Sequence, residues 1–219
     1  MGKDMSIIPA SVKTYGKVQF RKGCVIGEYT VVGYPYVESE ESFKDQDTKT
    51  SIGEKCIIGS HVIIYEGAVI GAETSIQDFC KIGEDVKIGK KCRILYGANI
   101  NGETIIGDNS IIADFCCDRA TIGNNVRLFG KLIHPHRKPQ LGWEDVTEDS
   151  PKVSNNVFIG FGAKVIGGIT IGTKSYIAAG AIVTKDVPDA HIVTGINKMV
   201  HYSKWKGKLK TSHFFLRSR

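Results

Sequence analysis

The sequence predicts an all-β protein, a parallel β-helix, from three observations. An isoleucine recurs every six residues, the residue after it is often glycine, and a small or β-branched residue follows four places later. From Ile52 to Ile112 there are eleven such isoleucines without a break. After a register slip of four residues around 118–121, the pattern resumes at Ile122 and Leu128, and it returns over 153–183.

A period of six matches neither an α-helix, with about 3.6 residues per turn, nor an amphipathic strand, with a period of two. It fits a chain that turns a corner every six residues, with the bulky aliphatic residue pointing inward and glycine or a polar residue at the corner. Three sides make one coil, and successive coils stack at roughly 4.8 Å. Stacking buries a continuous core that no single coil could bury alone.

The cysteines fit the same repeat and predict neither a disulfide framework nor a zinc site. The sequence has no CxxC spacing. The cysteines expected at the small inward position are Cys24, Cys56, Cys80, Cys92 and Cys116. A free thiol packs there as a small hydrophobic group. Cys117, one place later, is expected to face outward. A metal held by stacked thiols and an acyl-accepting Cys117 are the weaker alternatives.

We expect one β-helix domain over 1–189, with excursions at 33–50 and 135–152, followed by a basic cap over 190–219. Both ends need a cap because an open coil exposes an unpaired strand edge. The strand pattern over 7–18 is expected to cap the first coil, and one short helix from about Met199 to Leu209 the last. Tyr34 and Tyr36, in the first excursion, are expected to help cover an acceptor site; the alternative is a solvated surface excursion.

The distribution of charge argues against a nucleic-acid-binding protein. Residues 1–189 carry 22 basic and 23 acidic side chains, whereas 190–219 carry seven basic and no acidic ones. Such a tail serves phosphates, membranes or RNA, or is simply solvated. No stretch approaches the ~20 apolar residues of a membrane span, and no signal-peptide run follows Met1. These features predict a soluble, cytoplasmic protein without a nucleic-acid partner, for which membrane association is not expected.

The second excursion opens on His134-Pro135. Imidazole at the mouth of a loop is a candidate general base, because its reference pKa of about 6.5 lies near neutrality. The runs that follow are Ser154–Gly160, Gly167–Gly172 and Ala178–Pro188. With His134-Pro135 they resemble the hexapeptide-repeat acyltransferases, particularly galactoside and maltose acetyltransferases and nucleotide-sugar N-acetyltransferases. The resemblance implies a left-handed coil, against the usual right-handed crossover rule.

The resemblance also implies direct transfer from acetyl-CoA to an amine or hydroxyl of a sugar or nucleotide-linked sugar, between the subunits of a homotrimer and without a metal. His134 is implied as the base, and backbone N–H groups as the oxyanion donors. Asp114 and Asp118, near the register slip, are expected to contact the acceptor or to orient His134. The residues implied along coenzyme A are Gly160, Phe161, Gly162, Ala179, Thr184, Lys185 and Lys198.

Two other classes of protein remain open. A non-catalytic hexapeptide scaffold keeps the aliphatic repeat and has no need of His134-Pro135. A metal hydratase of the γ-carbonic anhydrase kind needs three histidines that converge on zinc between subunits. The histidines available, in a spacing that differs from those enzymes, are His61, His134, His136 and His191.

Overall fold

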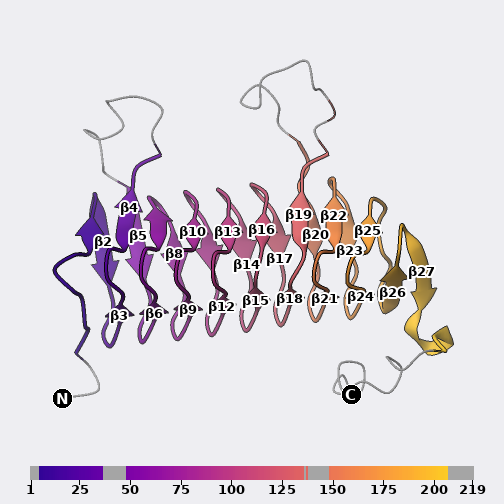
Figure 1. The fold of residues 1–219 in the computed structure, drawn as a ribbon, viewed down its shortest axis with the longest axis horizontal. Helices are drawn as coiled ribbons and strands as arrows, with labels where there is room; N and C mark the ends of the chain where they lie inside the picture. The colour runs from indigo at the N-terminus through magenta and orange to yellow at the C-terminus, as the bar shows by residue number, and fades with distance from the viewer. Residues whose placement is uncertain (1–4, 37–47, 136, 138–147, 207–219) are drawn as a thin grey trace.

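The chain folds as a parallel β-helix with three flat sides. The computed structural model describes residues 5–36, 48–135, 137 and 148–206. Each coil contributes one short strand to each of three sheets, and the coils stack along one long axis (Figure 1). All strand pairs are parallel apart from the last, β26 with β27, among the residues that are described.

The sheets are numbered here by their first strand. Sheet 1 contains β1 (Lys13–Thr14), β4 (Val31–Tyr34), β7 (Ile63–Tyr65), β10 (Lys81–Ile82), β13 (Asn99–Ile100), β16 (Phe115–Cys116), β19 (Lys131–Ile133), β22 (Lys164–Ile166) and β25 (Ile182–Val183). Sheet 2 contains β2 (Lys17–Phe20), β5 (Lys49–Ile52), β8 (Val69–Ile70), β11 (Lys87–Ile88), β14 (Ile105–Ile106), β17 (Thr121–Ile122), β20 (Lys152–Val153) and β23 (Thr170–Ile171). Sheet 3 contains β3 (Val25–Ile26), β6 (Ile57–Ile58), β9 (Ser75–Ile76), β12 (Arg93–Ile94), β15 (Ile111–Ile112), β18 (Arg127–Leu128), β21 (Phe158–Ile159), β24 (Tyr176–Ile177), β26 (His191–Thr194) and β27 (Lys198–His201).

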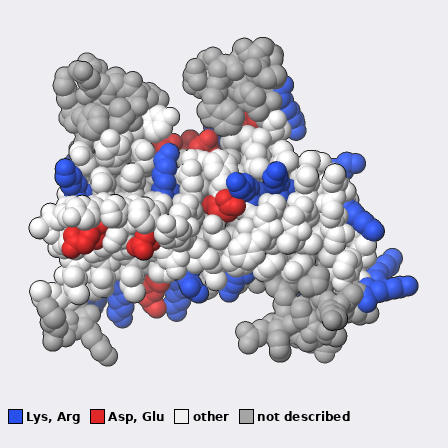
Figure 2. All heavy atoms as spheres, viewed as in Figure 1, with Lys and Arg blue, Asp and Glu red and all other residues white. Residues whose placement is uncertain are grey.

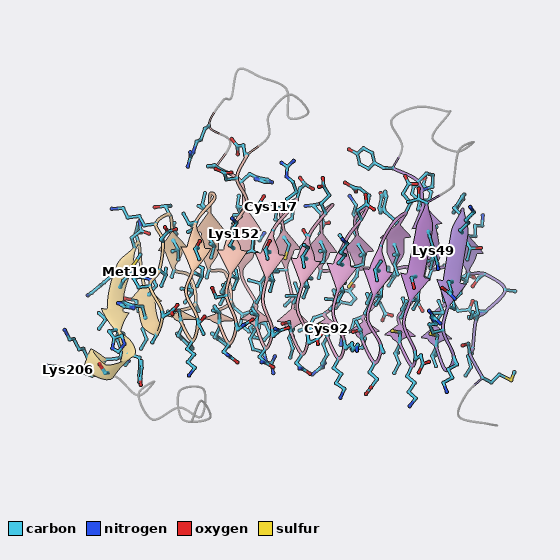
Figure 3. The ribbon with its side chains drawn as sticks, turned by 180° about the vertical axis from the view of Figure 1, so that it is seen from behind. Lys49, Cys92, Cys117, Lys152, Met199 and Lys206 are labelled. Carbon is cyan, nitrogen blue, oxygen red and sulfur yellow. The ribbon has the colours of Figure 1, made fainter. Side chains whose placement is uncertain are left out.

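The two residues of a typical strand have opposite environments. In β14, Ile106 points inward and is 2% exposed, whereas Ile105 points outward and is 46% exposed. Inward residues pair in register from coil to coil, as Ile82 does with Ile100. The outward side chains stand around the coils in Figure 3. The predicted six-residue period is therefore the alternation of inward strand residues with corners.

The corners are held by backbone geometry that few side chains adopt. Among the described residues, fifteen other than glycine have φ between 51° and 60°, in the left-handed region. This conformation turns their N–H along the helix axis, toward the preceding coil. The N–H of Phe79 donates to the carbonyl of Ser60 at 3.1 Å, and that of Glu103 to Glu84 at 2.8 Å. Each strained residue thus gains a hydrogen bond between coils.

The break in the six-residue period lies elsewhere than predicted. Ile112 and Cys116 are only four residues apart, as are Leu128 and Leu132, so two successive corners between sheets 3 and 1 are short. Cys116 pairs with the bulky residues Ile100 and Leu132, so its predicted place in the small position is wrong. A cysteine fits either position, and the aliphatic signal returns only at Ile122, which shifted the expected slip to 118–121.

The two ends of the helix are closed by strands. At the first coil, β1 and β2 form the outer edges of sheets 1 and 2, and Ile7 bridges to Val25 of sheet 3. At the last coil, β27 folds back on β26, with Met199 opposite Val193. The predicted cap helix is therefore wrong over 199–206, where a 3₁₀ turn, η3 (Tyr202–Lys204), follows β27. Residues 207–209 lie outside the described part. An antiparallel strand closes the edge because it pairs directly with the exposed backbone of β26.

Both long excursions leave the coils at the corner between sheets 1 and 2, which we call the loop corner. The first connects β4 to β5 and the second connects β19 to β20 (Figure 1). Gly33 and Tyr34 still belong to β4, and Lys49 and Thr50 already belong to β5. Four turns of this corner, β7–β8, β10–β11, β13–β14 and β16–β17, lie between the two excursions, so the bases of the excursions flank a stretch of short turns.

Within the described ranges, no helix is long and apolar enough to cross a membrane.

The alternation of environments gives a test of the fold. Ile106→Ala should lower the free energy of unfolding by about 2–5 kcal/mol, because it removes buried aliphatic volume and leaves a cavity. Ile105→Ala, its neighbour on the outward face, should cost less than about 1 kcal/mol. Urea denaturation followed by circular dichroism measures both, and equal effects would contradict the assignment of the inward face.

Candidate functional site

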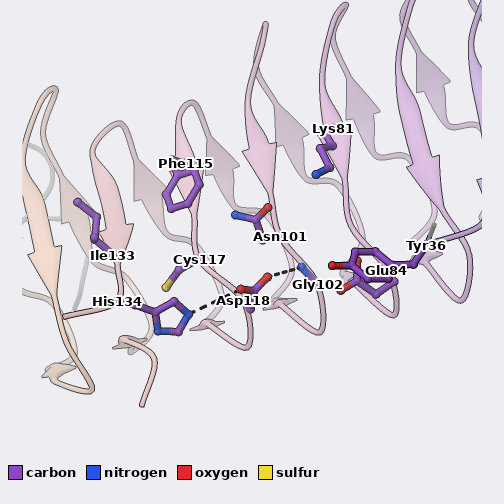
Figure 4. A pocket seen from close by; sticks show the side chains of 10 residues that line it. All are labelled: Tyr36, Lys81, Glu84, Asn101, Gly102, Phe115, Cys117, Asp118, Ile133 and His134. Atoms are coloured by element: carbon purple, nitrogen blue, oxygen red, sulfur yellow. Dashed lines mark hydrogen bonds and ion pairs between the residues drawn. The ribbon is translucent and has the colours of Figure 1, made fainter. Parts of the chain in front are cut away.

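A pocket of about 450 Å³ lies on the loop corner between the bases of the two excursions. Carboxylates gather on this stretch, shown in red between the two grey loops in Figure 2. The side chains that line the pocket come from sheet 1 and from the corner itself (Figure 4). They are Tyr36, Lys81, Glu84, Asn101, Gly102, Phe115, Cys117, Asp118, Ile133 and His134.

His134 lies at one end of this pocket, directly after β19. It is 8% exposed, and its Nε2 is 3.8 Å from Oδ2 of Asp118. The other carboxylate oxygen of Asp118 accepts a hydrogen bond from the backbone N–H of Gly102 at 3.1 Å. Asp118 is therefore fixed by the neighbouring coil and faces the imidazole, which suits a carboxylate that orients a histidine.

The second excursion returns to the corner beside Asp118. The hydroxyl of Ser150 donates to the carbonyl of Asp118 at 2.6 Å, and the N–H of Thr121 donates to the carbonyl of Pro151 at 3.2 Å. At the base of the loop, the N–H of Arg137 donates to a carboxylate oxygen of Glu148. These bonds hold both stems of the loop at the His134 end of the pocket.

At the opposite end, Glu66 joins the two stems of the first excursion. One carboxylate oxygen accepts from the N–H of Tyr36 at 3.0 Å, and the other from the hydroxyl of Thr48 at 2.9 Å. Tyr36 lines the pocket. The ring of Tyr34, named in the sequence prediction, instead packs edge-on against those of Tyr15 and Tyr65, at centroid distances of 5.4 and 5.6 Å. Its expected role at the acceptor stays a prediction.

Cys117 does not face outward as expected. It is 1% exposed and lies beneath the pocket, at the base of the second loop (Figures 3 and 4). The short corner before β16 shifts the register, so the residue after Cys116 turns into the wall. Burial raises the pKa of the Cys117 thiol to about 12, and the nearby Asp118 carboxylate adds to this. Because only the thiolate is a strong nucleophile, this thiol is poorly suited to accept an acyl group.

Asp114 and Asp118 lie at opposite ends of β16 and face different surroundings. Asp114 accepts from the N–H of Phe115 at 2.9 Å, and its Oδ1 is 3.8 Å from Nζ of Lys131. It does not line the pocket, whereas Asp118 does. Of the two candidate orienting residues, the structure brings Asp118 to His134.

The residues predicted along coenzyme A divide into two groups. Gly160, Phe161, Gly162 and Ala179 share the corner between sheets 3 and 1. Gly160 packs closely on the next coil, since a Cβ there would lie 2.6 Å from the nitrogen of Ala179. Gly162, at φ +68°, has open space where a side chain would stand. Phe161 is 66% exposed and stacks on Phe129 at a centroid distance of 4.6 Å.

The second group lies at the last coil. Thr184 and Lys185 follow β25 at the loop corner, and Lys198 begins β27. The side chain of Asn197 accepts from the N–H of Thr184 and donates to its hydroxyl, both at 2.8 Å. Both lysines are exposed. The roles of both groups remain predictions.

In the described part of the chain, no group of three or more His, Cys, Asp and Glu side chains is arranged to hold a metal ion. His61 lies on the corner between sheets 3 and 1, and His191 in β26. His136 lies outside the described residues.

Sequence reasoning missed Lys81, Glu84, Asn101 and Phe115 as pocket residues.

The spacing of residues in the sequence nevertheless indicated which side chains share the loop corner. The second residue after the inward position of each sheet 1 strand lines up along the loop corner. In chain order these residues are Glu66, Glu84, Gly102, Asp118 and His134, spaced by 18, 18, 16 and 16 residues. Aligning the sequence by coil rather than by hexad would have placed Asp118 next to His134 and Glu84 further along the same row.

Comparison with known proteins agrees with the repeat. The profile described as bacterial transferase hexapeptide (six repeats) matches residues 150–185, and that of the hexapeptide repeat of succinyl-transferase matches 49–77. The bifunctional protein GlmU of Clostridium botulinum (strain Kyoto / Type A2) is 27% identical over 219 residues, with 84% of this chain and 46% of that protein covered. GlmU of Geobacillus thermodenitrificans is 30% identical over 199 residues, with 74% of this chain and 43% of that protein covered.

The chain thus spans less than half the length of these relatives. Among solved structures, UDP-N-acetylglucosamine O-acyltransferase (LpxA) from Moraxella catarrhalis superposes with a TM-score of 0.57 at 19% identity, over 87% of this chain and 74% of that one. The predicted left-handed parallel β-helix is confirmed, as is the resemblance to hexapeptide-repeat acyltransferases.

The buried cysteines give a test of the site and the core together. Burial raises the pKa of Cys56 and Cys80 to about 11 and that of Cys117 to about 12. In the folded protein at mildly alkaline pH these thiols should therefore stay protonated and react slowly with a disulfide reagent such as DTNB. On unfolding their pKa returns to about 8.5 and they should react at once.

The sign for stability follows from the same shifts. The folded state keeps these protons longer, so stability should fall as the pH rises above about 8.5 toward the folded-state values. Counting released thionitrobenzoate with and without denaturant measures the difference in reactivity. Rapid labelling of Cys117 in the folded protein would contradict its burial.

Proposed function

We propose that this chain, a hexapeptide-repeat protein that resembles acyltransferases, transfers an acyl group from coenzyme A to an amine or hydroxyl of a sugar-like acceptor. The observation that carries the proposal is the pair of His134 and Asp118 in a pocket between two long excursions, with Nε2 3.8 Å from Oδ2. A buried imidazole beside a carboxylate, open to a cavity, is suited to general base catalysis.

In this mechanism the acceptor lies in the pocket with its nucleophilic group at His134. His134 takes a proton from that group as it attacks the thioester carbonyl carbon. The tetrahedral intermediate then collapses, the carbon–sulfur bond breaks, and the leaving thiolate takes the proton from His134. Asp118 orients the ring and stabilises the imidazolium formed midway. No covalent acyl-enzyme is needed, which agrees with the high pKa of the neighbouring Cys117 thiol.

The donor is proposed to lie along the corner between sheets 3 and 1. Gly162 and Gly180 both leave open space where a side chain would stand, so a thin pantetheine arm can approach the backbone closely. Phe161 offers an exposed apolar surface beside them. The exposed ammonium groups of Lys185 and Lys198, further along the helix, suit phosphate as point charges.

Sheet 1 separates this corner from His134. From Gly162 to Gly167, whose N–H bonds to Ile133 beside His134, the chain spans about 16 Å when extended. The proposed homotrimer removes this separation, because it places the corner between sheets 3 and 1 of one subunit against the loop corner of its neighbour. The expected site therefore uses His134 from one subunit and Gly162 and Gly180 from the next.

His134→Ala should lower kcat for acyl transfer by about 10²–10⁴-fold, the usual contribution of a general base. Thiol release from acetyl-CoA, measured across a panel of amino sugars, hydroxyl sugars and nucleotide-linked sugars, provides the assay. His61→Asn is the matched control: it removes an imidazole between β6 and β7, at least five coils from the glycines proposed along coenzyme A, and asparagine tolerates the left-handed backbone there.

If His134→Ala releases thiol as fast as the wild type, the chain is still a transferase but His134 is not its general base. If the wild type releases no thiol with any acceptor, titration with coenzyme A separates two cases. Binding favours an acceptor outside the panel, whereas no binding favours the non-catalytic scaffold.

A further inference from the structure

Two carboxylates stand on either side of Gly102 in the pocket. Glu84, Gly102 and Asp118 occupy equivalent places on three successive coils, which stack roughly 4.8 Å apart. The N–H of Gly102 donates to Oδ1 of Asp118 at 3.1 Å. On its other side, a Cβ on Gly102 would lie 1.9 Å from Oε1 of Glu84 and 2.5 Å from the carboxyl carbon. The Glu84 carboxylate thus fills the space of the missing side chain.

The backbone does not explain glycine at this position. Gly102 is absent from the glycines with positive φ, so another residue could adopt its conformation. What a side chain would disturb is Glu84. Glycine at position 102 therefore leaves room for the Glu84 carboxylate to lie over the corner, on the side toward Asp118.

The charges around this pair do not balance. Glu84, Asp118, Lys81 and His134 are the charged or titratable groups that line the pocket, together with Tyr36 and the protonated thiol of Cys117. Lys81 is the one cation of fixed charge among these lining residues, and its Nζ also lies 5.2 Å from the ring centroid of Tyr65. Burial, and then repulsion from Asp118, raises the pKa of the Glu84 carboxyl. A cationic ligand group between the carboxylates would relieve both effects.

We propose that Glu84, held over Gly102 beside Asp118, is a specificity-determining residue that selects acceptors bearing a protonated amine over their hydroxyl counterparts. This rests on the proposed function, and it favours N-acylation over O-acylation. A charge-assisted hydrogen bond from an ammonium to a carboxylate is roughly twice as strong as the neutral bond that a hydroxyl makes. The bound ammonium releases one proton to water before its nitrogen attacks, and His134 takes the second during the attack.

The test compares matched pairs of probes that differ by one group: glucosamine with glucose, and UDP-glucosamine with UDP-glucose. Binding to the full-length protein at neutral pH is measured by calorimetry. In the wild type the amine of at least one pair should bind about tenfold more tightly than its hydroxyl partner. Glu84→Gln should weaken binding of that amine about tenfold and change binding of the hydroxyl partner less than about twofold.

Two further variants test whether the preference for the amine depends on the position of the Glu84 carboxylate. Glu103→Gln removes an exposed carboxylate next to Gly102 but outside the pocket, and should leave both affinities unchanged. Gly102→Ala displaces the Glu84 carboxylate and should lose the amine preference as Glu84→Gln does. Thermal unfolding of each variant confirms that it is folded.

The outcomes separate this inference from the proposed function. No preference for the amine in either pair, or a preference that Glu84→Gln leaves intact, overturns the role of Glu84 even if His134-dependent thiol release stands. Preferential amine binding that depends on Glu84, with neither thiol release nor coenzyme A binding, supports the carboxylate pair and contradicts the transferase.

Discussion

Each regular coil of this chain must close on itself so that the next one lies in register above it, and the rest of the structure depends on that closure. The corners achieve it with residues in the left-handed conformation, whose N–H groups point along the axis and bond to the coil before. Without those bonds, the strained backbone of these corner residues would lower the stability of the fold. With them, the inward aliphatic side chains stack into one core and every outward position is repeated at a fixed spacing.

Repetition also explains why function concentrates at irregular places. A solenoid of equivalent coils offers no distinct site until a coil is changed. In this chain, two kinds of irregularity occur close together. Two long excursions leave the same corner, with four short turns of that corner between them, and two shortened corners between sheets 3 and 1 shift the register nearby. The shift buries Cys117, while Asp118 and His134 keep equivalent places on adjacent coils. The pocket forms where these irregularities overlap.

The row of residues along the loop corner carries the chemistry that we assign. His134 and Asp118 form the proposed proton-transfer pair, and Glu84 lies beyond the glycine that separates the carboxylates. The same stacking that builds the core therefore sets the distance between a base, its orienting carboxylate and a proposed selectivity group. Each comes from a different coil, and none is near the others in sequence.

The sequence by itself determined the β-helix and most of its inward residues, because a six-residue period leaves few other folds. It also singled out His134 as the candidate base, from its place at the mouth of a loop. It did not locate the short corners, since Cys116 fits both the small and the bulky position. It also could not show that Glu84 and Asp118 face one pocket, because residues 34 positions apart meet only after the coils stack. The strand in place of the cap helix was likewise decided by the exposed edge of β26, which exists only in the folded chain.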